Sequence, residues 1–406
     1  IFAATVIIMK SAKRNITMLY LVKIAKWFML AMPIIVLFYQ DNGLSMTDVL
    51  TLQAVYSISI VIMEIPSGYM ADIWGRRNTI ILGAVLGTVG FGVYSFSFGF
   101  LGFLCAELIL GIGQSLISGA DSAMLYDTLF EQNRQDEYLK YEGRVLSLGN
   151  FSETFAAIAG GLLAEISLRT PFIAQIFVAF IAIPAAFILY EPIRTKQVGK
   201  GSIKRILAIV KYSIFTNINL RRNIFYSSLI GCATLTMAWF LQPYLFDILN
   251  FSKSEIGIAW SLLNLVVGLT TLIAYKIEKK AGMLNIVILI AILIPAGYIA
   301  MGFISSLWII PILFVFYFTR GIATPVLKDY INRITESDIR ATVLSVRNFV
   351  IRILFSIIGP FLGYYSDLYS LQSALLLAGC IFALGSFFTT VLYAKSIMKS
   401  TKKNLF

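Results

Sequence analysis

Polar side chains stand inside an otherwise apolar segment between residues 99 and 126. Glu107, Gln114 and Asp121 follow one another at intervals of seven residues, which places them on one helical face over about 21 Å. A carboxyl group in apolar surroundings holds a proton more readily than one in water, because desolvation disfavours its charged form. The pattern predicts a cavity wall with Asp121 as a proton carrier and Glu107 as the alternative. The competing interpretation of Glu107 is a shallow position near the outer surface.

Four basic side chains also fall inside apolar segments. A charge at the centre of a membrane helix costs at least ~2.5–3.5 kcal/mol, so each one needs a partner or an aqueous cavity. Lys23 and Lys26 are one helical turn apart; we expect Lys23 to extend to the inner membrane surface and Lys26, which lies deeper, to be a ligand candidate.

The other two basic side chains have candidate partners elsewhere in the sequence. Arg320 is expected to face Asp121 across a cavity, where each would neutralise the other. Arg352 and Glu153 form a second possible pair. A purely structural ion pair between helices is the alternative in both cases.

Further candidates for a cavity wall are Trp239 and Gln242, which share one predicted span. Known enzyme motifs are missing. The chain has no histidine, hence no H-E-x-x-H zinc motif, and it has no P-loop. We expect no catalytic residues, no metal and no cofactor, and an ion gradient, that of protons, as the energy source.

Apolar runs dominate the whole chain. Hydrophobic residues make up 58% of the 406 residues and charged residues 13%, which is more apolar than a soluble domain. A bilayer core of ~30 Å is crossed by about 20 apolar residues in a helix. Twelve spans are therefore predicted, at residues 16–39, 47–70, 78–96, 99–126, 142–165, 171–190, 223–246, 255–275, 283–303, 307–328, 342–366 and 371–394.

The net charge of +12 would suggest a nucleic-acid partner for a soluble protein, but here it reports membrane orientation. Most Lys and Arg residues lie in the terminal tails and the even-to-odd connections, and only Arg169 and Lys253 fall in the opposite loops. The positive-inside rule places both termini in the cytoplasm of a multi-pass inner-membrane protein. We expect no nucleic-acid partner and a monomer in the lipid bilayer. No removable signal peptide is expected, and Met9 is a candidate native start.

The longest connection divides the chain near its middle. The predicted organisation is an N-terminal tail (1–15), a six-helix bundle (16–190), a basic linker (191–222), a second six-helix bundle (223–394) and a C-terminal tail (395–406). Within the linker, apolar residues from Ile203 to Ile214 recur at helical spacing. They indicate a helix lying on the inner membrane surface, with a solvated basic linker as the alternative.

The two halves resemble each other in sequence. Residues 145–150, VLSLGN, match residues 343–348, VLSVRN, and residues 125–127, LYD, match residues 327–329, LKD. The offsets of 198 (343 − 145) and 202 (327 − 125) are each close to half the chain. Internal repeats with a substrate site between them are typical of secondary transporters.

A short motif follows the second predicted span. Residues 68–77 read GYMADIWGRR, in which Gly68 and Gly75 would permit tight turns. This sequence resembles the G-x-x-x-D-x-x-G-R-[RK] signature of the major facilitator superfamily. The resemblance implies an all-α membrane protein with twelve transmembrane helices in two pseudo-symmetric six-helix bundles.

The same resemblance implies a cytoplasmic charge cluster that holds the two halves together when the transporter faces outward. In the first half the implied members are Gly68, Asp72, Gly75, Arg76 and Arg77, with Asp127 and Arg144 as partners. In the second half the counterparts are Glu278, Asp329 and Arg340. Solvated loop charges, worth ~0–1 kcal/mol per pair, are the alternative.

The resemblance and the membrane carboxylates together predict a secondary active transporter that is not an enzyme. Two features depart from family antiporters: Glu107 stands where fourth spans often carry an Arg, and the fifth span lacks the Pro of the antiporter motif. Proton-coupled efflux of small amphipathic molecules is the first hypothesis. Proton-coupled uptake of an anionic or zwitterionic nutrient is the second, and an integral membrane enzyme or lipid scramblase is a remote third.

Overall fold

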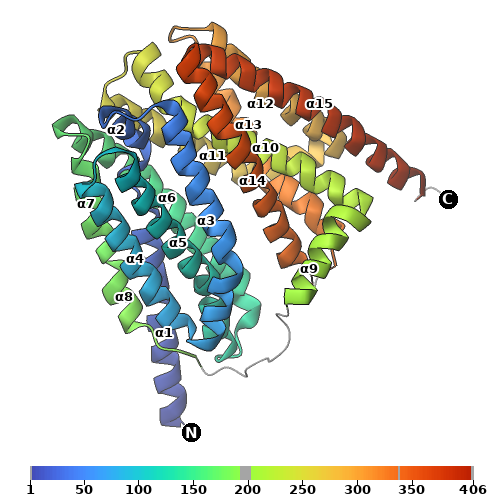
Figure 1. Cartoon of the computed structure of the whole chain (residues 1–406). Helices are drawn as coiled ribbons and strands as arrows, with labels where there is room; N and C mark the ends of the chain where they lie inside the picture. Colours follow the sequence, from blue (N-terminus) through green and yellow to red (C-terminus); the bar gives the residue numbers. More distant parts are fainter. Residues whose placement is uncertain (1, 193–202, 337–338, 404–406) are drawn as a thin grey trace. The chain divides into compact units, whose positions relative to one another are not determined.

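The computed structural model describes residues 2–192, 203–336 and 339–403, and these residues form helices and connections without a strand (Figure 1). Long apolar runs become helices because a helix satisfies its own backbone hydrogen bonds where water is absent. The elements are α1 (Phe2–Trp27), η1 (Met32–Ile34), α2 (Ile35–Asp41), α3 (Met46–Ile73), α4 (Arg76–Phe96), α5 (Gly99–Phe130), η2 (Gln135–Glu137), α6 (Tyr138–Ile166), α7 (Thr170–Phe180), α8 (Ala182–Ile188), α9 (Ile203–Lys211), η3 (Tyr212–Thr216), α10 (Ile218–Pro243), η4 (Tyr244–Ile248), α11 (Lys253–Ala281), α12 (Met283–Phe303), α13 (Ile309–Arg333), α14 (Arg340–Leu368) and α15 (Leu371–Lys403).

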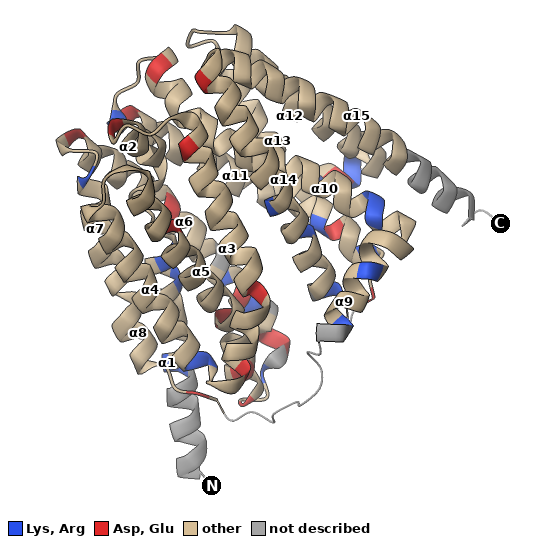
Figure 2. Cartoon of the chain, viewed as in Figure 1, with Lys and Arg blue, Asp and Glu red and all other residues tan. Residues whose placement is uncertain are grey.

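Among the described residues, eleven helical segments are long and apolar enough to cross a membrane. The remaining predicted span, 142–165, lies within the continuous helix α6, which carries polar residues such as Asn150 and Glu153. The twelve-helix fold predicted from the sequence is therefore present. Figure 2 shows that charged residues are concentrated near the helix ends and that the middle of most helices is free of them.

Several helix boundaries differ from the predictions. The first span is broken between Trp27 and Ile35, where Pro33 begins a 3₁₀ turn, because proline lacks the N–H that a continuing helix uses. The predicted sixth span is divided between α7 and α8. The described residues of both predicted tails are helical, since α1 begins at Phe2 and α15 continues to Lys403.

The chain divides into two compact units. Unit 1 comprises Ile1–Leu44, Val55–Gln197 and Ser252–Ser261, and unit 2 comprises Ser45–Ala54, Val198–Phe251 and Leu262–Phe406. The division falls inside the predicted linker, 191–222. The predicted bundles, 16–190 and 223–394, differ from the units at two places, because the first turns of α3 belong to unit 2 and those of α11 belong to unit 1.

These two helix starts are capped in the same way. The first backbone N–H groups of a helix have no partner inside it. In unit 2, the Asp367 carboxylate accepts hydrogen bonds from the N–H groups of Met46 (2.9 Å) and Thr47 (2.7 Å) at the start of α3. In unit 1, Glu165 accepts one from the N–H of Ser254 (2.8 Å) at the start of α11. Glu165 and Asp367 are 202 residues apart, the offset of the sequence repeat, so the caps are a structural counterpart of that repeat.

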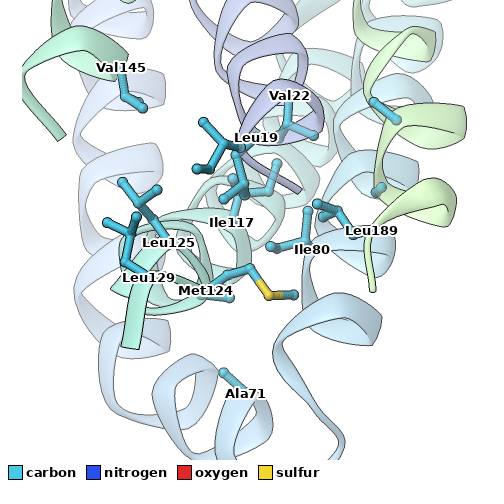
Figure 3. Packing of buried hydrophobic residues seen from close by; sticks show 14 residues of the cluster. Leu19, Val22, Ala71, Ile80, Ile117, Met124, Leu125, Leu129, Val145 and Leu189 are labelled. Carbon is cyan, nitrogen blue, oxygen red and sulfur yellow. The ribbon is translucent and has the colours of Figure 1, made fainter. Parts of the chain in front are cut away.

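Unit 1 has a continuous apolar core near one end of its helices. Buried side chains from α1, α3, α4, α5, α6 and α8 pack there, and Figure 3 shows Leu19, Ile80, Ile117 and Leu125 among them. This packing fixes the rotation of α1, α4 and α5, the helices that carry the polar candidates of this unit.

The linker contains a helix, α9, although residues 193–202 of the predicted linker lie outside the described residues. Ile209 and Val210 of α9 and Ile214 of the following η3 pack against a core of unit 2 that includes Ile224, whereas Leu207 is exposed. Part of the apolar face predicted to contact lipid is therefore covered by protein.

Candidate functional site

Glu107 lies in an aromatic enclosure inside unit 1. The residue is 3% exposed, and its Oε1 atom accepts hydrogen bonds from the hydroxyl groups of Tyr39 (2.7 Å) and Tyr94 (2.5 Å). The two hydroxyl groups also contact each other. Side chains of α2, α4 and α5 thus meet in a buried cluster. The shallow position near the outer surface stays an alternative, because Tyr39 and Tyr94 stand close to the ends of α2 and α4.

Aromatic rings surround this cluster. The Tyr39 ring lies 5.2 Å from the Phe103 ring, and the Tyr94 ring lies 5.3 Å from the Phe172 ring, measured between centroids. Phe38 and Phe172 are in closer contact, at 4.1 Å. The rings exclude water from the carboxyl group, and a buried carboxyl group needs hydrogen-bond partners of the kind that the tyrosines supply.

Arg169, in the connection between α6 and α7, binds the ends of two helices that border this enclosure. Its guanidinium group donates to the carbonyl oxygens of Ser95 (2.7 Å) in the last turn of α4 and Ser97 (3.0 Å) just after it, and to the Oδ1 of Asn42 (2.9 Å) after α2. It also lies over the Phe38 ring, 5.1 Å from its centroid. Burial lowers the pKa of this guanidinium from its ordinary value, yet arginine stays charged at neutral pH. Arg169, one of the two basic residues predicted for the loops on this side, thus holds the ends of α2 and α4 together.

Asp121 lies further along α5 and pairs with a lysine. Its Oδ2 is 3.5 Å from the Nζ of Lys23, and the two side chains are 13% and 10% exposed. Its Oδ1 accepts a hydrogen bond from the N–H of Ser122 (2.7 Å). Lys26 is close enough for its charge to act on both Asp121 and Lys23. The Glu142 carboxylate accepts a hydrogen bond from the Ser122 hydroxyl (2.9 Å) beside Asp121. This corner of unit 1 therefore holds two lysines and two carboxylates.

The pairing gives Asp121 a partner that was not expected. Lys23 was expected to extend to the membrane surface, and its ammonium group instead lies against Asp121. Arg320, the expected partner, belongs to unit 2 and lies over the Tyr317 ring of its own helix, 5.5 Å from the centroid, so its pairing with Asp121 stays a prediction. A lysine on the adjacent α1 neutralises Asp121 within its own unit.

Arg76, in the motif after α3, forms an ion pair with Asp127 and also donates to the carbonyl oxygen of Ala123. Arg144, the other predicted partner, lies over the Tyr141 ring at 5.6 Å and forms no ion pair among the described residues. Asp72 is exposed on the last turn of α3. The gating role of this cluster stays a prediction.

The turn of the motif is built on Gly75 and on a carboxylate that the sequence reasoning missed. Gly75 has φ +102°, which side chains rarely adopt, whereas Gly68, also expected to form a turn, lies inside the continuous helix α3. The Glu191 carboxylate accepts hydrogen bonds from the N–H groups of Arg76 (3.0 Å) and Arg77 (2.8 Å). It therefore caps α4, whose N-terminus favours a negative charge.

The counterpart in unit 2 uses a different arginine from the one predicted. Arg333 lies 3.3 Å from Glu278 and 2.6 Å from Asp329, whereas Arg340 donates to the carbonyl oxygen of Thr335 (3.3 Å). The sequence repeat does not point to Arg333. Arg333 stands one helical turn after Asp329 on α13, and that spacing was the available signal.

The other residues that were predicted to line a cavity keep that role as a prediction. Trp239 and Gln242 are buried in α10, and Gln114 is half-buried in α5. Glu153 belongs to unit 1 and Arg352 to unit 2, so their pairing stays a prediction. Among the residues that the structure describes, no group of Cys, Asp and Glu could hold a metal ion.

Comparisons with known proteins give one consistent result. The model of the Major Facilitator Superfamily matches residues 16–360. The class H tetracycline resistance protein of Pasteurella multocida is 22% identical over 82% of this chain and 82% of its own length. The quinolone resistance protein NorA of Staphylococcus aureus is 21% identical over 57% of this chain and 58% of its own. The nucleoside transporter NupG has the same fold, with a TM-score of 0.78 at 13% identity over 94% of this chain and 98% of its own.

Proposed function

Because the chain belongs to the major facilitator superfamily, we propose that it exports small amphipathic molecules across the cytoplasmic membrane in exchange for protons. Glu107 carries this proposal. It is a carboxyl group buried inside a membrane-spanning helix and held by two hydroxyl groups, and ionisable groups within membrane helices commonly mark proton pathways.

The tyrosines suit a carboxyl group that changes its protonation state. A phenolic hydroxyl can donate a hydrogen bond or accept one. Tyr39 and Tyr94 can therefore donate to an ionised Glu107 and, after rotation of a hydroxyl, accept from a protonated one. Neither state leaves the carboxyl group without a partner, so proton uptake does not require the enclosure to unfold. Asp121, by contrast, is already neutralised by Lys23.

Two relatives, a tetracycline and a quinolone resistance protein, support export. Uptake of an anionic nutrient is the second candidate, and the two lysines beside Asp121, Lys23 and Lys26, favour it. The distribution of Lys and Arg supports a cytoplasmic location for both termini.

Transport by the purified protein tests this function. The protein is reconstituted into proteoliposomes, a pH gradient is imposed in either direction, and movement of ethidium, tetracycline and benzoate is followed. Export coupled to protons predicts that a gradient drives ethidium or tetracycline against its concentration, and that reversing the gradient reverses the movement. Gradient-driven movement of benzoate alone would support the uptake candidate. Movement that ignores the pH gradient would exclude proton coupling.

The charge cluster after α3 is proposed to stabilise a closed cytoplasmic gate, as the family resemblance implies. Asp72→Asn removes one anion there and is expected to raise the labelling rate of a single cysteine placed at Gln114, reached from the cytoplasmic side. An increase of about two- to fivefold would correspond to the ~0.5–1 kcal/mol that an exposed charge contributes. Asp136→Asn, an exposed carboxylate of η2, is the matched control. Equal labelling in both variants would show that Asp72 does not gate.

A further inference from the structure

Arg347 is a buried cation in unit 2 with only neutral partners. It is 5% exposed in α14. Its Nε donates to the Ser227 hydroxyl on α10, and its Nη1 donates to the Oδ1 of Asn348 (3.2 Å). Within residues 2–192, 203–336 and 339–403, no carboxylate forms an ion pair with it and no group bonds its Nη2. Charges buried in proteins are ordinarily paired.

A second cation lies near the first. Lys328 on α13 is exposed on the surface of unit 2, five residues before the helix ends at Arg333. Its charge and that of Arg347 repel each other, and it too forms no ion pair with a described residue. The neighbouring carboxylate, Asp329, is bound to Arg333. Two cations near each other are unfavourable, and an anion between them would relieve the repulsion.

The cluster lies well inside its helices. Arg347 is seven residues after the start of α14 at Arg340, which corresponds to about 10 Å along the axis. Ser227 is nine residues after the start of α10 at Ile218, or about 14 Å. Val343, Val346 and Val350 of α14 pack with Leu220 and Ile224 of α10 in a compact apolar core, which holds both helices in place beside the guanidinium group.

The sequence repeat shows that the fold does not require a cation here. Arg347 in VLSVRN corresponds to Gly149 in VLSLGN. In unit 1, a Cβ atom at Gly149 would lie 3.1 Å from the Trp27 side chain, so that position is filled by packing. Unit 2 instead places a guanidinium group at the corresponding position and gives it a hydroxyl group as its partner. A structural role alone would not need this change.

We propose that Arg347, Lys328 and Ser227 form a binding site for an oxyanion, a carboxylate or a phosphate group. The planar guanidinium group suits such oxygens because it can donate two parallel hydrogen bonds. Its free Nη2 and the Lys328 ammonium group provide the donors that the protein leaves unused. The oxyanion belongs either to a soluble molecule, including a transported one, or to the phosphate of a membrane lipid. The site does not depend on proton coupling or on the direction of transport.

Binding to the full-length protein in maltoside detergent tests the site and separates the two sources. For soluble anions, inorganic phosphate and benzoate are titrated and thermal unfolding is followed by intrinsic fluorescence. For lipid, phosphatidylglycerol is added and its retention is measured by native mass spectrometry. Binding of the soluble anion or of the lipid is expected to be at least about tenfold weaker in Arg347→Gln than in wild type. This is the size expected when a charge-assisted hydrogen bond is lost. Arg347→Lys should retain part of the affinity.

The control is Lys276→Gln, which removes one exposed positive charge from unit 2 and should leave binding unchanged. If Arg347→Gln does not fold, Ser227→Ala and Lys328→Gln replace it and should each weaken binding. Soluble-anion binding that depends on these residues identifies a solute site, and dependent retention of phosphatidylglycerol alone identifies a lipid site. Absence of both, or equal binding by wild type and the variants, overturns the proposal. Failure of proton-driven transport would leave these binding results unaffected.

Discussion

Glu107→Gln is expected to reduce transport driven by a pH gradient to the background of empty liposomes, while exchange of labelled for unlabelled substrate continues without a gradient. Glutamine has nearly the shape of a protonated glutamate, and its Oε1 can still accept from Tyr39 and Tyr94. It cannot release a proton. The variant therefore removes coupling while it keeps the hydrogen bonds that hold α2, α4 and α5 together. The measurement compares both transport modes in the same proteoliposomes.

Two kinds of control sharpen this result. Glu131→Gln removes a carboxylate at the end of the same helix α5 and should leave gradient-driven transport unchanged. Tyr94→Phe removes one of the two hydroxyl groups from Glu107 but leaves the carboxyl group, so it should slow coupled transport without abolishing it. Gradient-driven transport at the wild-type rate in Glu107→Gln would exclude this carboxyl group as the proton carrier, provided that the substrate is moved by wild type.

Much of the fold could be predicted from the sequence because the membrane imposes simple constraints. A span needs about 20 apolar residues, and the chain shows such runs between clear polar breaks. Breaks inside a span were missed. Pro33 was visible in the sequence, but proline is tolerated in membrane helices such as α14, which continues through Pro360. Whether a helix bends or breaks at proline depends on the packing around it.

The candidate site was predicted less completely, because sequence spacing gives a residue's face on its own helix but not the helix that it meets. Glu107 and Asp121 were recognised as carboxylates in an apolar run. Their partners were not, since Tyr39 and Tyr94 are ordinary residues of apolar spans and Lys23 competes with Arg320 as a cation for Asp121. Pairing between helices is set by packing, which the sequence of one chain does not display.

Arg347 and Glu191 show two further limits. Arg347 lies inside the predicted span 342–366 but was not among the basic residues singled out there, and the structure buries it in α14. Comparison with Gly149 in the repeat was the signal that could have identified it. Glu191 was assigned to the linker, and only the fold brings it to the start of α4.

The Lys23–Asp121 pair provides the second large expected effect. Asp121→Asn leaves Lys23 and Lys26 one turn apart without their anion, and Lys23→Gln leaves Asp121 with Lys26 still nearby. Breaking a buried pair can cost roughly 3–5 kcal/mol, because the remaining charge is not compensated. We expect Asp121→Asn to lower thermal stability and transport more than Lys23→Gln does, since it leaves two like charges.

The neutral double variant, Lys23→Gln with Asp121→Asn, removes both members of the pair and should be more stable than Asp121→Asn alone. A double-mutant cycle in thermal unfolding measures this interaction free energy. Because Glu107 remains in place, the double variant is also expected to retain gradient-driven transport. A double variant that folds and exchanges substrate but no longer responds to a pH gradient would identify Asp121 as a coupling group. If Glu107→Gln then keeps its response to the gradient, the role assigned to Glu107 must be given up.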